Sequence, residues 1–255
     1  SRIRRRRPRS RHSRLSEVTV AENSGREGAA SLAGRLEAVQ LGLADAARSA
    51  GRLPDELTLI VVTKFHPASL VRNLAELGVR DVGENRHQEA QLKSAELASL
   101  DLRWHFIGQL QTKKARQAAQ YAHAIHSIDR ERLVDALATA EVPSPIDAFV
   151  QINLTDDPGR GGAAPAELER IAERVLETPT LRLRGVMAVA PLPEEEEATS
   201  AFARLRVFSE RLRSLDPNAS AISAGMTHDY VEAIAAGATH LRIGSAITGN
   251  RPVAG

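Results

Sequence analysis

A regular alternation of strand-like and helix-like segments runs through most of the 255 residues. Leu57–Thr63 is a continuous run of apolar and β-branched residues, which is typical of a strand buried on both faces. Seven further strands are predicted at Arg80–Glu84, Arg103–Gly108, Ala122–Ile128, Ile146–Asn153, Leu181–Val189, Ala219–Ser223 and His240–Gly244. Apolar residues at helical spacing predict helices at Ser31–Ala50, after Pro67, and at Gln88–Ala98, Lys113–Ala119, Arg130–Ala140, Ala166–Leu176, Ser200–Leu215 and Tyr230–Ala236.

Strands that alternate with helices imply a parallel sheet. Eight such units in about 200 residues predict a single (β/α)8 TIM barrel. A doubly wound open sheet is the alternative, but the turn after the first strand, Thr63-Lys64-Phe65-His66-Pro67, has no glycine-rich dinucleotide motif. No linker rich in Pro, Gly or Ser interrupts the alternation, so we expect one barrel domain over residues 31–255.

Residues 1–30 differ from the rest of the chain in charge. Eight arginines and no acidic residue occur among the first fourteen residues: Arg2, Arg4, Arg5, Arg6, Arg7, Arg9, Arg11 and Arg14. The whole chain has 34 Lys+Arg and 32 Asp+Glu, so without these eight the count is 26 against 32, a net charge of −6. We therefore predict a basic, disordered tail on an acidic body, and no specific nucleic-acid partner.

Composition excludes several classes of function. Cysteine is absent, which removes disulfides, thiolate metal sites and cysteine nucleophiles. Aromatic residues make up 3%, too few for the stacking platforms that bind single-stranded nucleic acid. No apolar run approaches the roughly 20 residues of a membrane span, and no apolar segment follows the basic residues as in an export signal. We expect a cytoplasmic protein with no membrane partner.

Lys64 is the most distinctive candidate for chemistry, because it closes the first predicted strand and is one of only four lysines among 34 basic residues. Active groups of barrels lie at the carboxyl ends of strands. Desolvation at an apolar barrel mouth favours the neutral, nucleophilic amine that a Schiff base requires. The alternative is a lysine that extends into solvent from a strand end.

Small residues follow the seventh and eighth predicted strands: Ser223, Gly225, Met226, Thr227, Gly244 and Ser245. Backbone N–H groups and hydroxyls at this place bind phosphate in many barrels, although two ordinary tight turns would give the same pattern. A lysine and a phosphate site at one barrel mouth together suit pyridoxal phosphate, which has an aldehyde at one end and a phosphate at the other.

Other motifs are weaker candidates. Pro158-Gly159-Arg160-Gly161-Gly162 resembles a phosphate loop but has no Walker lysine. His123 and His126 are three residues apart on a predicted strand, so we expect them on opposite faces and not on one metal. Together with His105 they are predicted to be packed or hydrogen-bonded histidines.

Ten motifs in order along the chain resemble those of the pyridoxal phosphate-binding homeostasis proteins, relatives of the N-terminal barrel of alanine racemase. The resemblance extends from about Leu32 to Gly249. The motifs are Thr63-Lys64, Gly83-Glu84-Asn85 with Gln88-Glu89, Trp104-His105-Phe106-Ile107-Gly108 with Leu110-Gln111, His126-Ser127-Ile128-Asp129, Gln151-Ile152-Asn153, Gly185-Val186-Met187-Ala188, Ser223 with Gly225-Met226, Asp229, Ala233-Ile234, and Arg242-Ile243-Gly244.

The resemblance implies a role for each matching residue. Lys64 would hold pyridoxal 5'-phosphate as an internal aldimine, Asn85 would lie beside the cofactor ring, and Arg242 would lie near the pyridine nitrogen. The phosphate cradle would consist of Ser223, Gly244 and Ser245, with Met226 and Thr227 close by. It also implies an alanine-racemase-type barrel, a role in vitamin B6 homeostasis, apo pyridoxal enzymes as recipients, and a monomer.

A non-catalytic binder and a racemase-like pyridoxal phosphate enzyme are the two competing functions. Racemisation needs acid–base groups on both faces of the substrate adduct, and in alanine racemase a tyrosine from a separate domain supplies the second. Tyr121 and Tyr230 are the only tyrosines here, and neither lies at a predicted strand end. An arginine at the ring nitrogen also weakens the electron sink that carbanion chemistry uses. The sequence therefore favours the binder.

Overall fold

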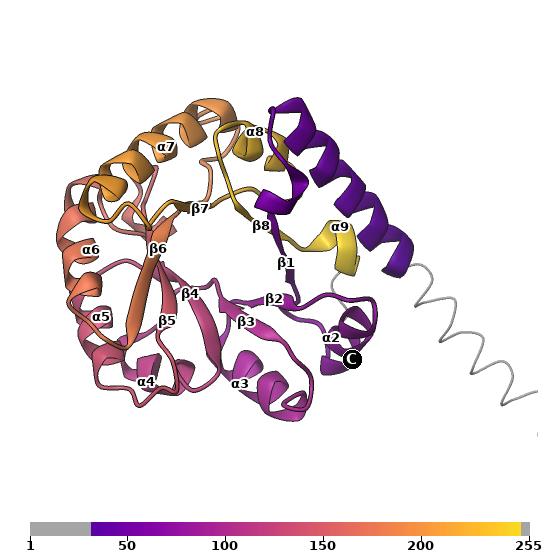
Figure 1. Cartoon of the computed structure of the whole chain (residues 1–255), viewed down its shortest axis with the longest axis horizontal. Coiled ribbons are helices and arrows are strands. Elements are labelled where there is room, and N and C mark those ends of the chain that lie inside the picture. Colours follow the sequence, from indigo (N-terminus) through magenta and orange to yellow (C-terminus); the bar gives the residue numbers. More distant parts are fainter. Residues whose placement is uncertain (1–31, 251–255) are drawn as a thin grey trace, which may run out of the picture.

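The computed structural model describes residues 32–250, and these contain a closed barrel of eight parallel strands (Figure 1). The strands are β1 (Thr58–Val62), β2 (Asp81–Glu84), β3 (Arg103–Phe106), β4 (Ala122–Ile128), β5 (Ile146–Gln151), β6 (Leu181–Met187), β7 (Ala221–Ser223) and β8 (His240–Ile243). Each strand pairs with its sequence neighbours, and β8 returns to pair with β1. The predicted (β/α)8 barrel is confirmed, and the open sheet is excluded.

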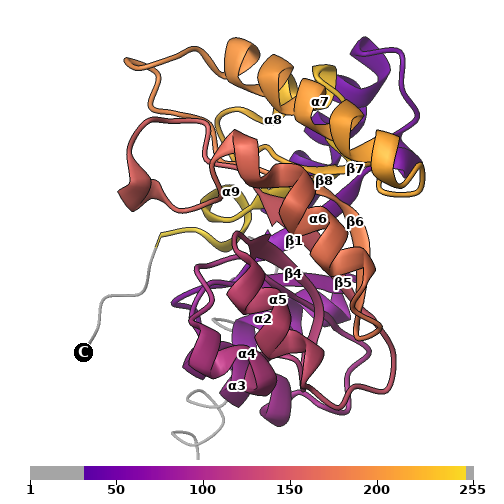
Figure 2. The ribbon, with the colours of Figure 1, turned by 90° about the vertical axis from the view of Figure 1, so that its left-hand side faces the viewer.

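Helices surround the barrel and cover its outer face, with α5 and α6 lying over the strands in Figure 2. They are α2 (Ala68–Glu76), α3 (His87–Glu96), α4 (Ala115–Ala118), α5 (Glu131–Ala138), α6 (Leu168–Leu176), α7 (Ala198–Leu215), α8 (Tyr230–Ala235) and α9 (Ser245–Thr248). A further helix, residues 32–49, precedes β1 and lies beside α8 and α9. Within residues 32–250, no helix is long and apolar enough to cross a membrane.

The helix over residues 32–49 is attached to the end of the barrel fold by specific contacts. Leu32, Leu36 and Leu43 are buried in the core. The Arg35 guanidinium donates a 2.7 Å hydrogen bond to the carbonyl of Ile247 in α9. The first helix that the structure describes is therefore bonded directly to the last one, α9.

Most differences from the sequence predictions are at element ends. The helix expected at Lys113–Ala119 is a 3-10 turn, Thr112–Lys114, followed by the four-residue α4. The strands expected to reach Thr63 and Asn153 stop at Val62 and Gln151, although the Thr63 and Ile152 N–H groups still donate to the neighbouring strands at 2.9 Å. The predicted basic tail, residues 1–30, lies outside the described residues.

The inside of the barrel is small and partly polar, whereas the layer between strands and helices is apolar. Ala124, Phe149, Met187 and Ala221 form the apolar cluster of four neighbouring strands, β4 to β7. Buried polar side chains lie among them, including His126, which stacks on Phe149 at 4.3 Å between ring centroids. Buried polar groups need hydrogen-bond partners, and these partners define the site described below.

Gly185 is required where β6 pairs with β7. It lies opposite Ala221, and a Cβ at this position would be 1.7 Å from the Ala221 carbonyl oxygen. We expect Gly185→Ala to lower the free energy of unfolding by about 3 kcal/mol, because neighbouring backbone has to move. Urea unfolding measures this. Gly34→Ala, in the helix over residues 32–49 with no atom within 4 Å, should instead stabilise the protein by about 1 kcal/mol. Equal changes in the free energy of unfolding of the two variants would show that the close approach of Gly185 to Ala221 does not require glycine.

Candidate functional site

Strand register brings three predicted site residues to one edge of the barrel. Val62 of β1 lies opposite Gly83 of β2, and Val61 of β1 lies opposite Ile243 of β8. Parallel strands end at the same side, so Lys64, Asn85 and Gly244, each within two residues of a strand end, share this edge. Their elements are adjacent in the barrel although the residues span 180 positions of sequence.

Lys64 is exposed to solvent in the turn between β1 and α2. Its Nζ lies 5.9 Å from the centroid of the Phe65 ring. Phe65 has φ 67, a left-handed conformation that non-glycine residues rarely adopt. Of the two alternatives for Lys64, the structure supports the lysine that extends into solvent over the one desolvated at an apolar mouth. The amine is instead freely accessible to a ligand.

A buried ion-pair cluster fixes the backbone on both sides of this lysine. Lys93 Nζ donates to Glu84 Oε1 at 2.6 Å and to the Thr63 carbonyl at 3.0 Å. The Thr63 hydroxyl donates to the same Glu84 oxygen at 2.6 Å. The Phe65 N–H donates to Glu89 Oε2 at 3.1 Å. Burial raises the pKa of Glu84, against the effect of Lys93. Sequence reasoning missed this cluster, and the rarity of lysine was the only signal for it.

Arg242 is the buried cation of the barrel interior, with 4% of its surface exposed. Its Nη1 donates to Ser223 Oγ at 2.7 Å, and its Nη2 donates to the Ala188 carbonyl at 2.8 Å. Burial lowers the pKa of Arg242 to about 10, and Asp229 raises it in part. The guanidinium is therefore charged at neutral pH and is held from β7 and from the end of β6.

Ser223 Oγ also belongs to a chain of histidines. His126 Nδ1 lies 2.8 Å from Ser223 Oγ, and His126 Nε2 lies 2.9 Å from His105 Nδ1. His105 Nε2 lies 2.9 Å from Asp81 Oδ1. The prediction of packed or hydrogen-bonded histidines is confirmed for His105 and His126, whereas His123 is exposed. Asp81 was not a candidate, because an acid at the start of a strand gives no signal of a side-chain partner on the next strand.

The expectation that His123 and His126 lie on opposite faces does not hold. Both rings approach the His105 ring, at 5.7 and 5.1 Å between centroids. The register between β3 and β4 shifts at Trp104/His105, so simple alternation fails there.

The residues predicted for a phosphate cradle separate into two groups. Ser223 is fully buried, and its hydroxyl is engaged by Arg242 and His126. Ser245 and Met226 are exposed, and Gly244 and Thr227 are half-buried. The Met226 N–H donates to Asp229 Oδ1 at 2.6 Å. Gly244 and Ser245, after β8, are therefore open to a ligand, whereas the buried Ser223 accepts a hydrogen bond from Arg242.

Asn85 brings an unsatisfied acceptor to the same edge. Its Oδ1 is buried and has no hydrogen-bond partner within the described residues. Gly108, after β3, packs so closely on Asn85 that a Cβ there would be 2.2 Å from the Asn85 carbonyl oxygen. A buried acceptor without a donor is unusual and fits a group that a ligand completes.

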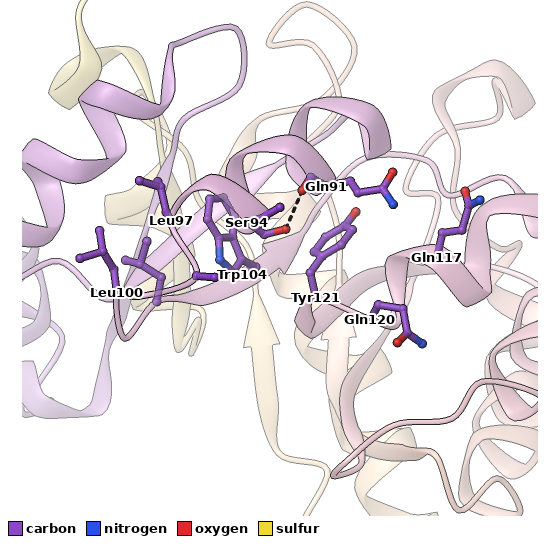
Figure 3. Close-up of a pocket in the computed structure, with 11 residues that line it drawn as sticks. Gln91, Ser94, Leu97, Leu100, Trp104, Gln117, Gln120 and Tyr121 are labelled. Carbon is purple, nitrogen blue, oxygen red and sulfur yellow. Dashed lines mark hydrogen bonds between the residues drawn. The ribbon is translucent and has the colours of Figure 1, made fainter.

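A separate hollow of about 400 Å³ lies on the outer layer between α3 and α4 (Figure 3). Trp104, Tyr121 and Gln117 line it, and Ser94 beside them donates a 3.0 Å hydrogen bond to the Gln91 carbonyl. None of the predicted site residues lines this hollow. It lies on the helical side of the sheet, so the strand-end site is the better candidate for chemistry.

Comparison with known proteins agrees with the fold. The family model described as alanine racemase, N-terminal domain, matches residues 44–252. The alanine racemase of Corynebacterium glutamicum has the same fold, with a TM-score of 0.62 at 17% identity over 86% of this chain and 62% of that one.

A pyridoxal phosphate homeostasis protein of Pseudomonas aeruginosa is 43% identical over 212 residues, which cover 81% of this chain and 90% of that protein. The chain belongs to the pyridoxal phosphate homeostasis protein family. A solved structure, PipY of Synechococcus elongatus with PLP bound, is 34% identical, with a TM-score of 0.70, and the match covers 86% of this chain and 100% of that one.

Within this family fold, the two tyrosines lie away from the site edge. The Tyr121 hydroxyl lies 3.3 Å from His87 Nδ1 in the helical layer, and burial raises its pKa well above the usual value. Tyr230 begins α8. The prediction that neither lies at a strand end is confirmed.

The buried histidine predicts acid sensitivity. Burial lowers the pKa of His126 well below its ordinary value, and nearby histidines and Arg242 lower it further. The folded state then holds His126 neutral, whereas the unfolded chain binds a proton below about pH 6.5. Lowering the pH from 6 to 5 should therefore cost about 1 kcal/mol of unfolding free energy from this group. Urea unfolding at each pH measures the slope.

His126→Phe should reduce that slope, and His228→Gln, which changes an exposed histidine, should leave it unchanged. An unchanged slope in His126→Phe would show that this histidine does not carry the pH dependence.

Proposed function

We propose that this protein holds pyridoxal 5'-phosphate without catalysing a reaction on it, and acts in vitamin B6 and thereby amino-acid homeostasis. The observation that carries the proposal is the shared strand edge, where an exposed lysine and the Gly244–Ser245 turn lie on adjacent strands. The family name of its relatives and the PLP-bound PipY structure support the same function.

The residues at this edge fit the chemistry of the cofactor. Pyridoxal phosphate supplies an aldehyde that condenses with a primary amine, forming a C=N bond and releasing water. Lys64 has the accessible amine for this step. A guanidinium cannot replace it, because arginine stays protonated.

Three further groups would hold the rest of the molecule. Arg242 would donate to the pyridine nitrogen, and Asn85 Oδ1 is the unsatisfied acceptor beside the ring. The Gly244 and Ser245 backbone N–H groups and the Ser245 hydroxyl would bind the phosphate, with Met226 and Thr227 near them. Ser223 joins the site through Arg242, since its hydroxyl is buried beneath the opening.

The same arrangement favours holding over catalysis. Proton transfer on both faces of a substrate adduct requires two positioned groups, and neither Tyr121 nor Tyr230 lies at the strand ends. Arg242 stays charged at neutral pH, so it would donate to an unprotonated ring nitrogen and weaken the electron sink. Delivery to apo pyridoxal enzymes, a cytoplasmic location and a monomeric state stay predictions from the sequence.

Lys64→Ala should abolish the visible absorption band that appears when the protein is incubated with pyridoxal phosphate, because the other lysine near this edge, Lys93, is buried and bonded to Glu84 and Thr63. Lys64→Arg should fail equally. Lys113→Ala, which removes an exposed lysine elsewhere, is the matched control and should keep the band. Borohydride reduction and peptide mass mapping identify the modified residue. A band that persists in Lys64→Ala would contradict the proposal.

Ser245→Ala should weaken pyridoxal phosphate more than phosphate-free pyridoxal. A hydrogen bond to a charged group contributes about 1.5–3 kcal/mol, so the phosphate form should lose one to two decades of affinity. Absorbance titration of both ligands measures the difference, with Ser94→Ala in the helical layer as control. Equal weakening of both ligands would place the phosphate elsewhere, and the Gly159–Gly162 loop would be the next candidate.

A further inference from the structure

A continuous file of hydrogen bonds crosses the barrel interior and ends on Arg242. Its members come from five strands: Asp81 in β2, His105 in β3, His126 in β4, Ser223 in β7 and Arg242 in β8. Asp81 is the first residue of its strand, so the file starts at the end of the barrel opposite the proposed cofactor site. Each link is between 2.7 and 2.9 Å.

With His105 and His126 neutral, the two ends of the file fix the direction of every donor in it. Burial opposes ionisation of Asp81, but hydrogen bonds from His105 and Arg103 lower its pKa to about 2. The carboxylate is therefore an acceptor, and His105 Nε2 must carry the proton that it donates. His105 Nδ1 then accepts from His126 Nε2–H.

The last two links, His126 with Ser223 and Ser223 with Arg242, also donate toward Asp81. His126 Nδ1, having no proton, accepts from the Ser223 hydroxyl. The free lone pairs of Ser223 Oγ then accept from Arg242 Nη1. This order holds with both imidazoles neutral, because a neutral imidazole has one donor and one acceptor, whereas a second proton on His105 would reverse both links of His126.

The surroundings of His126 keep it neutral, which this direction requires. Its ring is fully buried and stacks on Phe149. The titratable and charged groups that face it are His105 on β3, His123 on β4 itself, and His240 and Arg242 on β8. All are bases, so none favours a second proton on the ring.

We propose that Asp81, His105 and His126 are positioning residues for Arg242: the negative charge at one end of the barrel sets the hydroxyl direction of Ser223 at the other end, and so holds the guanidinium toward the pyridine ring. The inference rests on the proposed function, because that function gives Arg242 its ligand. A hydroxyl turned the other way would accept from His126 Nδ1–H as well as from Arg242, and would be a weaker acceptor for the guanidinium.

The chain offers a matched control for Asp81. Asp147 in β5 is equally buried, at 8% exposure, and also binds arginines, Arg182 and Arg184 of β6. Its contact with His123 is 4.0 Å, and it does not join the file. Asp147→Asn therefore removes a comparable charge without touching Arg242.

The first test uses protein without ligand. Nitrogen-15 NMR of the histidine rings should show His105 and His126 of the wild type as neutral Nε2–H tautomers. Asp81→Asn removes the charge that fixes the direction, so both rings should become tautomer mixtures, whereas Asp147→Asn should leave them unchanged. Wild-type rings in any other state would overturn the inference.

The second test adds pyridoxal phosphate. Asp81→Asn should lower its affinity by about 2- to 30-fold and shift the absorption maximum, as substitutions along such networks do. Asp147→Asn should do neither. Equal responses of the two variants would overturn the inference, whereas a wild type that forms no visible band would contradict the proposed function instead.

A second pair of variants covers the case in which Asp81→Asn does not fold. His105→Phe removes both links of the ring and should reproduce the loss of affinity and the spectral shift. His105→Gln offers one N–H and one oxygen, and should restore the wild-type spectrum. A glutamine variant that behaves like the phenylalanine variant would show that donor direction is not what positions Arg242.

Discussion

Pairing of β8 with β1 is the interaction on which the site depends. Four successive residue pairs, from Thr58 with His240 to Val61 with Ile243, close the barrel. Without this ladder, the turn after β1 and the turn after β8 would be the two free edges of an open sheet, far apart in space. Closure places the lysine and the glycine-serine turn on neighbouring strands, and it encloses the side chains that face inward.

Enclosure explains why the barrel interior can hold polar groups. Arginine and histidine are expensive to bury unless every polar atom finds a partner. The interior supplies partners from different strands, so each hydrogen bond also ties one strand to another. Ser223, for example, joins β4 and β8 through a single hydroxyl. The polar interior therefore depends on the closed ring, and a side chain there cannot move alone.

The sequence predicted the barrel and the edge of the site for a clear physical reason. Buried parallel strands are short apolar runs, and the residue after each run must lie at the barrel mouth. That rule located Lys64, Asn85 and Gly244 without any knowledge of their contacts. It could not give the direction of the Lys64 amine, because the direction follows from the left-handed Phe65 and its bond to Glu89. Sequence also gave no sign of partners that meet only across the barrel, as His126 of β4 and Ser223 of β7 do.

The exposed position of Lys64 has a consequence for how long a bound aldehyde stays. Condensation of an amine with an aldehyde releases water, and in bulk solvent the same water can attack the product and reverse the reaction. Enzymes commonly seal such a linkage away from solvent to protect reactive intermediates. Under the proposed function, a turn whose backbone is held by hydrogen bonds and whose amine is open would form a linkage at a defined place that remains hydrolysable. Such a site is suited to loading and unloading, with residence time governed by solvent access.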